Sequence, residues 1–292
     1  MAVSRLRLPL RLCSVACLAM VLALGYILLR SPLLMEASAE APIPRPVPAG
    51  NRDRHAHKAD GAGSTKYFSE PGGSYNLVHY DSRYFQRELD AAERRAALRA
   101  LIRSYLSLTS HYNIETWLAH GTLMGWWWGG RILPWDSDID VQLSFETLDL
   151  LAREFNFTEF RYDLPPAHGR PASRTYLLDI NPYYSEPGIG DGNNVIDARW
   201  IDTETGMFVD ITALRREDDG SGAWACKDGH RYSGTDLWPL KESELEGVRA
   251  LVPAQSTLLL RREYGDDSTK KEEYEGHHWD HHLRLWVQDV NK

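Results

Sequence analysis

The amino-acid sequence predicts an α+β domain with a mixed α/β sheet and flanking helices, preceded by one N-terminal transmembrane helix. Three observations carry this prediction. Residues 12–29 form an uncharged apolar run, close to the ~20 residues that a membrane-spanning helix needs. Residues 89–112 repeat apolar side chains at three- and four-residue spacing, as an amphipathic helix does. Residues 137–143 alternate apolar and polar side chains, which is typical of a half-buried strand.

The remaining helices and strands are expected in sequence order. A short buried strand at 116–119 precedes a turn at Gly121-Thr122 and a helical piece that ends near Trp128. Helical spacing returns over 145–155, and a last helix at 254–264 ends at Gly265. Short strands are expected at 174–180, 194–201 and 207–212.

The N-terminal composition predicts four segments. Arg5, Arg7 and Arg11 precede the apolar run, and the positive-inside rule therefore keeps them in the cytosol. The expected segments are a cytosolic tail (1–11), a membrane anchor (12–29), a flexible Pro-, Ala- and Gly-rich stem (30–65) and a lumenal domain (66–292). We therefore expect a type II single-pass protein of the Golgi membrane. A cleaved signal peptide is the alternative, because Ala37-Ser38-Ala39 has the small-residue pattern of a cleavage site.

The charge of the chain argues against nucleic acid as a partner. The first 65 residues hold 8 of the 33 Lys and Arg and 4 of the 41 Asp and Glu, so the remainder has a formal net charge of −12. Nucleic-acid binding needs clustered basic residues to neutralise phosphates. An acidic domain can still bind a phosphate when a divalent cation lies between them.

Three aspartates predict a site for Mg²⁺ or Mn²⁺. Asp138 and Asp140 are two residues apart on the predicted strand, so their side chains share one face. Asp210 lies in the mostly apolar segment 206–212, where a lone carboxylate is costly unless it is paired or bound to metal. We expect these three side chains to hold the metal and to act in catalysis. A calcium loop is excluded, because Val141 and Thr147 occupy its Gly and Glu positions.

Neighbouring residues are predicted to contact the substrate. Gly121 and Thr122 follow a buried strand and open a helix, an arrangement that lets backbone N–H groups approach a phosphate. Arg131 is a candidate phosphate clamp. Of the tryptophans at 126–128 and at 135, at least two are expected in the core or cavity wall, and one is a candidate for stacking on a base or sugar ring. Trp135 is among the predicted substrate-binding residues.

Two further features are weaker signals of metal chemistry. The segment 277–282 reads HHWDHH, but its spacing fits no structural zinc pattern, and a solvated surface segment is the competing interpretation. Cys226 is the only cysteine beyond the apolar run, which excludes an intrachain disulfide in the lumenal part.

The sequence resembles the LicD/fukutin family, and within it the fungal proteins linked to mannosylphosphate transfer onto glycans. Four segments carry the resemblance: HGTLMGWWW, RILPWDSDIDVQL, NVIDARWIDTETGMFVDIT and LLLRREYG. It spans roughly residues 67–286. The long Lys/Glu-rich tail of fungal relatives is reduced here to 270–273, and the zinc-binding cysteines of the animal fukutin-related branch are missing.

The resemblance implies a nucleotidyltransferase-like fold and a phosphotransferase. Such an enzyme moves a phosphosugar, here mannose 1-phosphate from GDP-mannose, onto a cell-wall or protein-linked glycan and releases a nucleoside monophosphate. By motif, Asp138, Asp140 and Asp210 correspond to the metal-binding acids, with Asp210 the candidate to accept the glycan hydroxyl proton. Asp136 corresponds to an extra acid of the same motif. Asp197 and Arg199 are expected at the donor or acceptor site.

Two other functions stay open at this stage. A metal-dependent glycosyltransferase also uses Asp-x-Asp, but it releases a nucleoside diphosphate and leaves Asp210 and the Gly-Thr turn without a role. Pro134 also argues against a central strand directly before the motif. The other alternative is a lumenal protein without activity of its own that activates a partner transferase. The expected partners are a nucleoside-diphosphate-linked donor, a glycan acceptor and the membrane, with a partner transferase if the protein is an activator.

Overall fold

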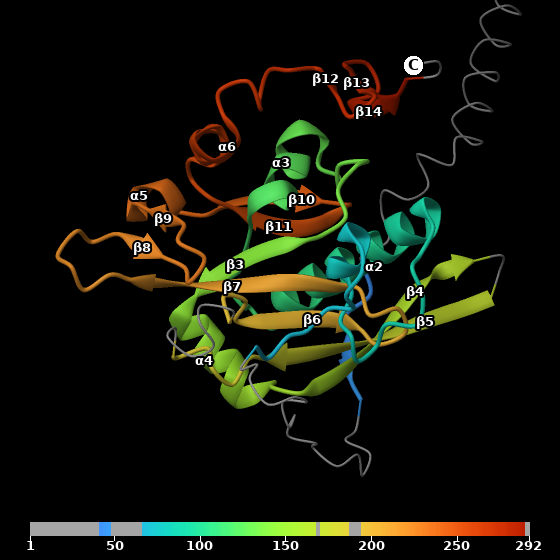
Figure 1. Ribbon diagram of the computed structural model, residues 1–292, viewed down its shortest axis with the longest axis horizontal. Helices are drawn as coiled ribbons and strands as arrows, with labels where there is room; N and C mark the ends of the chain where they lie inside the picture. The colour runs from blue at the N-terminus through green and yellow to red at the C-terminus, as the bar shows by residue number, and fades with distance from the viewer. Residues whose placement is uncertain (1–40, 48–65, 168–169, 187–193, 290–292) are drawn as a thin grey trace, which may run out of the picture. The chain divides into compact units, whose positions relative to one another are not determined.

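A nine-stranded sheet organises the part of the chain that the computed structural model describes, residues 41–47, 66–167, 170–186 and 194–289 (Figure 1). The strands run in the order β1-β4-β5-β6-β7-β3-β2, and β8 and β9 extend one end of β7. Their bounds are β1 Arg45–Pro46, β2 Trp117–Leu118, β3 Asp140–Ser144, β4 Thr158–Ala167, β5 Arg170–Ile180, β6 Ala198–Asp202, β7 Phe208–Arg216, β8 Trp224–Ala225 and β9 Arg231–Tyr232.

The pair β3–β7 is parallel, whereas the other pairs of this sheet are antiparallel. Its register sets Asp140 opposite Asp210 and Leu143 opposite Ala213. Val141, Leu143, Val209 and Ile211 are all buried. Since residues two apart share one face of a strand, these side chains bury one face of the parallel pair in the core.

The helices are few and mostly short. They are η1 Tyr75–His79, α2 Ala91–His111, α3 His120–Gly129, α4 Phe145–Glu154, α5 Gly234–Leu237 and α6 Ser256–Tyr264. Asp90 caps α2 by accepting hydrogen bonds from Ala92 N and Glu93 N, and the Glu93 side chain returns a bond to Asp90 N. This reciprocal cap fixes the start of the longest described helix. The helix packs on β6, β7 and β11.

Two smaller sheets complete the described fold. The hairpin of β10 Lys241–Leu245 and β11 Val248–Val252 turns at Glu246 and Gly247, both of which have positive φ. The three-stranded sheet contains β12 Glu273–Tyr274, β13 His277–Asp280 and β14 Leu285–Gln288. Trp279 and Trp286 of this sheet contact Trp128 of α3 with ring centroids 5.2 and 4.9 Å apart. The C-terminal strands therefore belong to the packing of the domain.

The predicted α+β class, a mixed α/β sheet with flanking helices, is wrong: the described residues are mostly sheet with few helices. The expected helices are present as α2, α3, α4 and α6, and the expected strands as β2, β3, β5, β6 and β7. No clear alternation predicts β4 or β8 to β14. These strands are short, polar or interrupted by proline, and they are stabilised by pairing with the strand next to them in the chain, as β4 is by β5.

The predicted transmembrane helix is not part of the fold just described. No helix in residues 41–47, 66–167, 170–186 and 194–289 combines the length and apolar character needed to cross a membrane. Residues 1–40, which include the predicted tail and anchor, lie outside the described residues, as do 48–65 of the predicted stem. Residues 41–47 of that stem are described, and β1 pairs there with β4.

An aromatic cluster at the sheet centre should dominate stability. Trp200 of β6 is fully buried, stacks on Tyr176 at an interplanar angle of 17° and donates a hydrogen bond to Ser104 Oγ at 2.9 Å. We expect Trp200→Ala to lower the free energy of unfolding by about 3–5 kcal/mol, because it leaves a large cavity. Urea denaturation measures the loss. The control Leu150→Ala removes an exposed side chain and should change stability by less than about 1 kcal/mol. Equal losses in the two variants would contradict this assignment of the core.

Candidate functional site

Four aspartates converge where β3 begins. Asp140 is the first residue of β3 and lies beside Asp210 in the parallel register with β7. Asp136 and Asp138 lie in the segment that enters β3, and both contribute to the electrostatic environment of Asp140. The structure therefore places the three predicted metal ligands and the extra acid of the same motif near one another, although no three of their carboxylate oxygens lie within 4.8 Å of one another. We call these four residues the carboxylate cluster.

The carboxylate cluster has more negative charge than its own surroundings neutralise. Burial raises the pKa of Asp140 well above its usual range, and the charges of Asp138 and Asp210 add to this effect. Burial also raises the pKa of Asp136 to about 8, helped by its hydrogen bond and charge interaction with Asp138. Oδ2 of Asp136 is buried and has no hydrogen-bond partner in the described part of the chain. Either a proton or a bound cation can relieve the unfavourable burial of these carboxylates.

Arg199 provides positive charge next to the carboxylate cluster. This β6 side chain is 3% exposed, and its Nε donates to Asp210 Oδ1 at 2.9 Å. Its Nη2 donates to Glu70 Oε1 at 2.6 Å, and its guanidinium carbon lies 3.6 Å from the ring centroid of Phe208. Burial raises the pKa of Asp210, and the charge of Arg199 opposes that rise. Arg199 therefore orients one oxygen of Asp210 within the cluster.

Gly121 and Thr122 support the cluster from the start of α3. A Cβ atom on Gly121 would lie 2.9 Å from Asp136 Oδ2, so only glycine leaves room for that carboxylate. Thr122 is buried, and its Oγ1 accepts a hydrogen bond from Asp140 N at 2.9 Å. The Gly-Thr turn, predicted as a phosphate cradle, thus contacts both ends of the aspartate motif.

Two residues of the site were missed in the sequence. His79 at the end of η1 has Nδ1 4.0 Å from Asp138 Oδ2, while its Nε2 is buried and has no partner among the described residues. Burial lowers the pKa of His79, although Asp138 and Asp210 oppose this. Glu70 reaches the cluster through Arg199. Neither residue belongs to a spaced motif, and more than 50 residues separate each of them from Asp136, so the sequence contained no usable signal.

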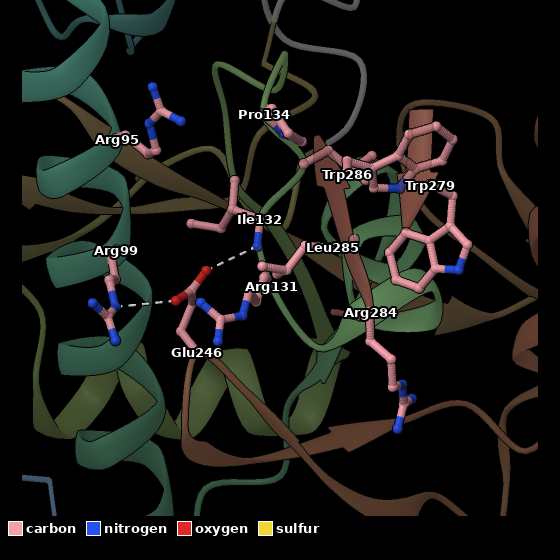
Figure 2. A pocket seen from close by; sticks show the side chains of 13 residues that line it. Arg95, Arg99, Arg131, Ile132, Pro134, Glu246, Trp279, Arg284, Leu285 and Trp286 are labelled. Carbon is pink, nitrogen blue, oxygen red and sulfur yellow. Dashed lines mark hydrogen bonds and ion pairs between the residues drawn. The ribbon is translucent and has the colours of Figure 1, made fainter. Parts of the chain in front are cut away.

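Two predicted substrate residues lie in a different place. Arg131 lines a cavity of about 300 Å³ together with other arginines and with Trp279 and Trp286, and no aspartate lines this cavity (Figure 2). Trp135 packs on Tyr274 and Trp286 with ring centroids 5.2 and 5.0 Å apart. Both residues therefore contact the C-terminal strands rather than the carboxylate cluster.

Asp197 is fully buried at the start of β6. Lys227 Nζ lies 2.8 Å from its Oδ1, and Ala213 N donates to its Oδ2 at 2.8 Å. Burial raises its pKa, and the charge of Lys227 opposes this. These contacts join β6, β7 and the β8–β9 turn, which is the arrangement of a structural ion pair.

The histidines of 277–282 lie on the C-terminal strands and in the following turn. His278 pairs with Asp289 at 2.7 Å, and His281 pairs with Glu272 at 2.9 Å. Within the described residues these histidines do not gather into a group of three metal ligands. The structure therefore gives this segment a set of surface ion pairs.

The donor set of the carboxylate cluster fits a hard divalent cation. All of the converging groups are carboxylates, and oxygen is the ligand atom that Mg²⁺ and Mn²⁺ prefer. The unpartnered oxygen of Asp136 and the raised pKa of Asp140 are both relieved when a cation binds.

Comparison with known proteins agrees with the motif found in the sequence. Residues 113–255 match the family described as "LicD/FKTN/FKRP, nucleotidyltransferase domain". This region includes the carboxylate cluster and Arg199, but not Glu70, His79 or the three C-terminal strands.

Two proteins of Saccharomyces cerevisiae (strain ATCC 204508 / S288c) are similar to the chain. Mannosyltransferase regulator 4 is 34% identical over 171 residues, which cover 56% of this chain and 14% of the relative. Mannosyltransferase regulator 14 is 33% identical over 170 residues, which cover 56% of this chain and 18% of the relative. The chain thus matches less than a fifth of the length of either curated relative.

Replacing Arg199 should destabilise the fold strongly. Arg199→Met keeps the length of the side chain but leaves Asp210 and Glu70 without their buried partner. We expect a loss of about 3–5 kcal/mol in the free energy of unfolding, measured by urea denaturation. Arg161→Met is the matched control. Arg161 also lies on a strand, but its side chain is 61% exposed and forms a long ion pair of 3.8 Å with Asp163. It should cost less than about 1 kcal/mol. A loss for Arg199→Met no larger than that of the control would contradict this role of Arg199.

Proposed function

Since the chain belongs to the LicD family through residues 113–255, we propose that it is a metal-dependent phosphotransferase of glycan modification. In this proposal it moves a phosphosugar from a nucleoside-diphosphate donor, most simply mannose 1-phosphate from GDP-mannose, to a hydroxyl of a glycan. The released product is a nucleoside monophosphate. The names of the two yeast relatives support a role connected with mannosyl transfer.

One observation carries the catalytic part of the proposal. Asp140 and Asp210 lie opposite each other on a parallel strand pair, and burial raises the pKa of both. A fold gains no stability from like charges kept close together in a buried position. Their retention is explained when they bind a cation that the reaction uses.

Asp138, Asp140 and Asp210 would hold Mg²⁺ or Mn²⁺, with Asp136 at the edge of the same site. When bound there, the metal supplies positive charge that stabilises the donor diphosphate and the charge developing on the leaving nucleotide. Arg199 holds Asp210 in a fixed orientation through Nε. Thr122 holds the start of β3 through its bond to Asp140 N. Both residues therefore act by positioning the carboxylates.

The proposed reaction forms one bond and breaks one bond. The oxygen of the glycan hydroxyl forms a bond to the phosphorus that carries the sugar. The bond between that phosphorus and the oxygen bridging to the second phosphate breaks, and its electrons leave with the nucleoside monophosphate. We assign Asp210 to accept the hydroxyl proton, because Arg199 opposes the rise of its pKa and so favours the ionised form.

The names of the two yeast relatives favour a second candidate function. Both are called mannosyltransferase regulators, which fits a protein that binds and activates a partner transferase. In that case the carboxylate cluster would stabilise or regulate a complex. The two functions differ in whether the purified chain alone turns over a donor.

The nucleotide product tests the proposed reaction. The purified full chain, supplied with Mn²⁺, GDP-mannose and a mannan acceptor, should release GMP, and a chelator should abolish this release. Asp140→Asn should lower the rate at least about a hundredfold, because metal charge stabilisation is worth several kcal/mol. Chromatography of the released nucleotides measures both effects. Asp266→Asn, an exposed aspartate beyond α6, should keep full activity.

Any result other than release of GMP in this assay would point to a different function. Release of GDP would identify a glycosyltransferase. No nucleotide from GDP-mannose or CDP-linked donors, together with stimulation of a separate mannosyltransferase by the chain, would identify a regulator. Full activity in a folded Asp140→Asn variant would overturn the assignment of the metal ligands.

Metal binding should also stabilise the fold. We expect Mn²⁺ at about one hundred times its dissociation constant to add about 2.7 kcal/mol of stability, because the metal binds the folded state only. Thermal unfolding with and without Mn²⁺ measures this effect. The stabilisation should disappear in Asp140→Asn and persist in Asp266→Asn. A metal-induced shift that is equal in both variants would place the Mn²⁺ elsewhere.

A further inference from the structure

We propose that His120, His230 and Glu263 form a second metal site, which binds Zn²⁺ and lies beside the carboxylate cluster. The ligand atoms of these three side chains all lie within 4.8 Å of one another. They come from segments that are far apart in the sequence. His120 begins α3, His230 lies in the turn between β8 and β9, and Glu263 is in the last turn of α6.

The three side chains converge closely. Nδ1 of His120 lies 2.7 Å from Oε1 of Glu263, and the rings of His120 and His230 have centroids 4.5 Å apart. The side chains of His120, Glu263 and His230 are 16%, 26% and 33% exposed, so the cluster is partly shielded from water and still accessible to an ion. Two imidazoles and a carboxylate form a donor set that Zn²⁺ commonly uses.

The backbone of His120 supports a specific role for its side chain. His120 has φ of 49°, in the left-handed region that a residue with a Cβ atom rarely adopts. This conformation has an energetic cost. A surface ion pair with Glu263 alone contributes too little to explain that cost. A metal bond shared with Glu263 and His230 would offset it.

One ring nitrogen of His230 has a polar neighbour, since Nδ1 lies 3.5 Å from Sγ of Cys226. A histidine that binds a metal usually has such a partner, which accepts the N–H that faces away from the ion and orients the ring. This contact leaves Nε2 of His230 for the metal, whereas Nδ1 of His120 faces Glu263. Nε2 of His120 lies 3.5 Å from the amide nitrogen of Gln142.

The proposed zinc site is separate from the carboxylate cluster but mechanically connected to it. Gln142 lies on β3 two residues after Asp140, so both side chains share one face of the strand. His120 directly precedes Gly121 and Thr122, which contact Asp136 and Asp140. Zinc would therefore fix the turn that positions the aspartates. Three protein ligands also leave one coordination position open for water or substrate.

Metal analysis of the purified, untagged full chain tests the proposal. We expect about one zinc ion per chain, bound tightly enough to persist through dialysis. His230→Ala should lose this zinc. Glu263→Gln, which keeps the size and hydrogen-bonding capacity of the side chain, should weaken zinc binding at least about tenfold. Circular dichroism verifies that each variant is folded. In the zinc-free protein, a titration with Zn²⁺ against a chelating dye gives the affinities.

His281→Ala is the matched control, because His281 is a 72% exposed histidine that pairs with Glu272 outside the cluster. It should retain full zinc content. Zinc kept by a folded His230→Ala variant and lost from His281→Ala would move the site to the C-terminal strands and overturn the proposal. An absence of bound zinc, with no uptake of added Zn²⁺ by the folded wild-type chain, would also overturn it. Since these measurements need no turnover, they are independent of the proposed phosphotransfer.

Discussion

The buried guanidinium of Arg199 is the interaction on which the carboxylate cluster depends. It lies between Asp210, Glu70 and Asp81, at 2.9, 2.6 and 3.7 Å from the respective carboxylate oxygens. Arg83 extends this ion-pair network, since it lies 2.7 Å from Asp81 and 2.6 Å from Asp179. This network ties the segment before α2 to strands β5, β6 and β7. A buried charge is tolerated when it is paired in this way, although Nη1 of Arg199 has no hydrogen-bond partner among the described residues.

The sequence predicted elements with a clear period and missed those without one. Apolar residues at helical spacing identified α2, and the alternation of Ile139, Val141 and Leu143 identified β3. Strand β10 reads KESEL and is mostly exposed, and it is held by its pairing with β11, by the buried Leu245 and by a hydrogen bond from Trp126 to Ser243. Pairing of this kind depends on tertiary context, which a local pattern does not contain. The predicted balance of helix and strand was therefore wrong although the individual periodic elements were found.

The same division applies to the candidate site. Asp138 and Asp140 follow from their spacing, and Asp210 follows from its position among apolar residues. The resemblance to the family added Arg199, whose contact with Asp210 arises from the antiparallel register of β6 and β7. Glu70 and His79 come from a segment with neither period nor motif. Spacing along one chain reveals ligands on one strand, but it does not reveal which distant segment folds over that strand.

The three C-terminal strands change how the boundary of this domain should be drawn. The family match ends at residue 255, yet Trp279 and Trp286 beyond it pack on Trp128, and Gly129 has room for no side chain because Arg284 O lies 2.9 Å from its Cβ position. The region that matches the family is therefore shorter than the region that packs together in the fold. The side chains that α3 can accommodate therefore depend on residues outside the matched family region.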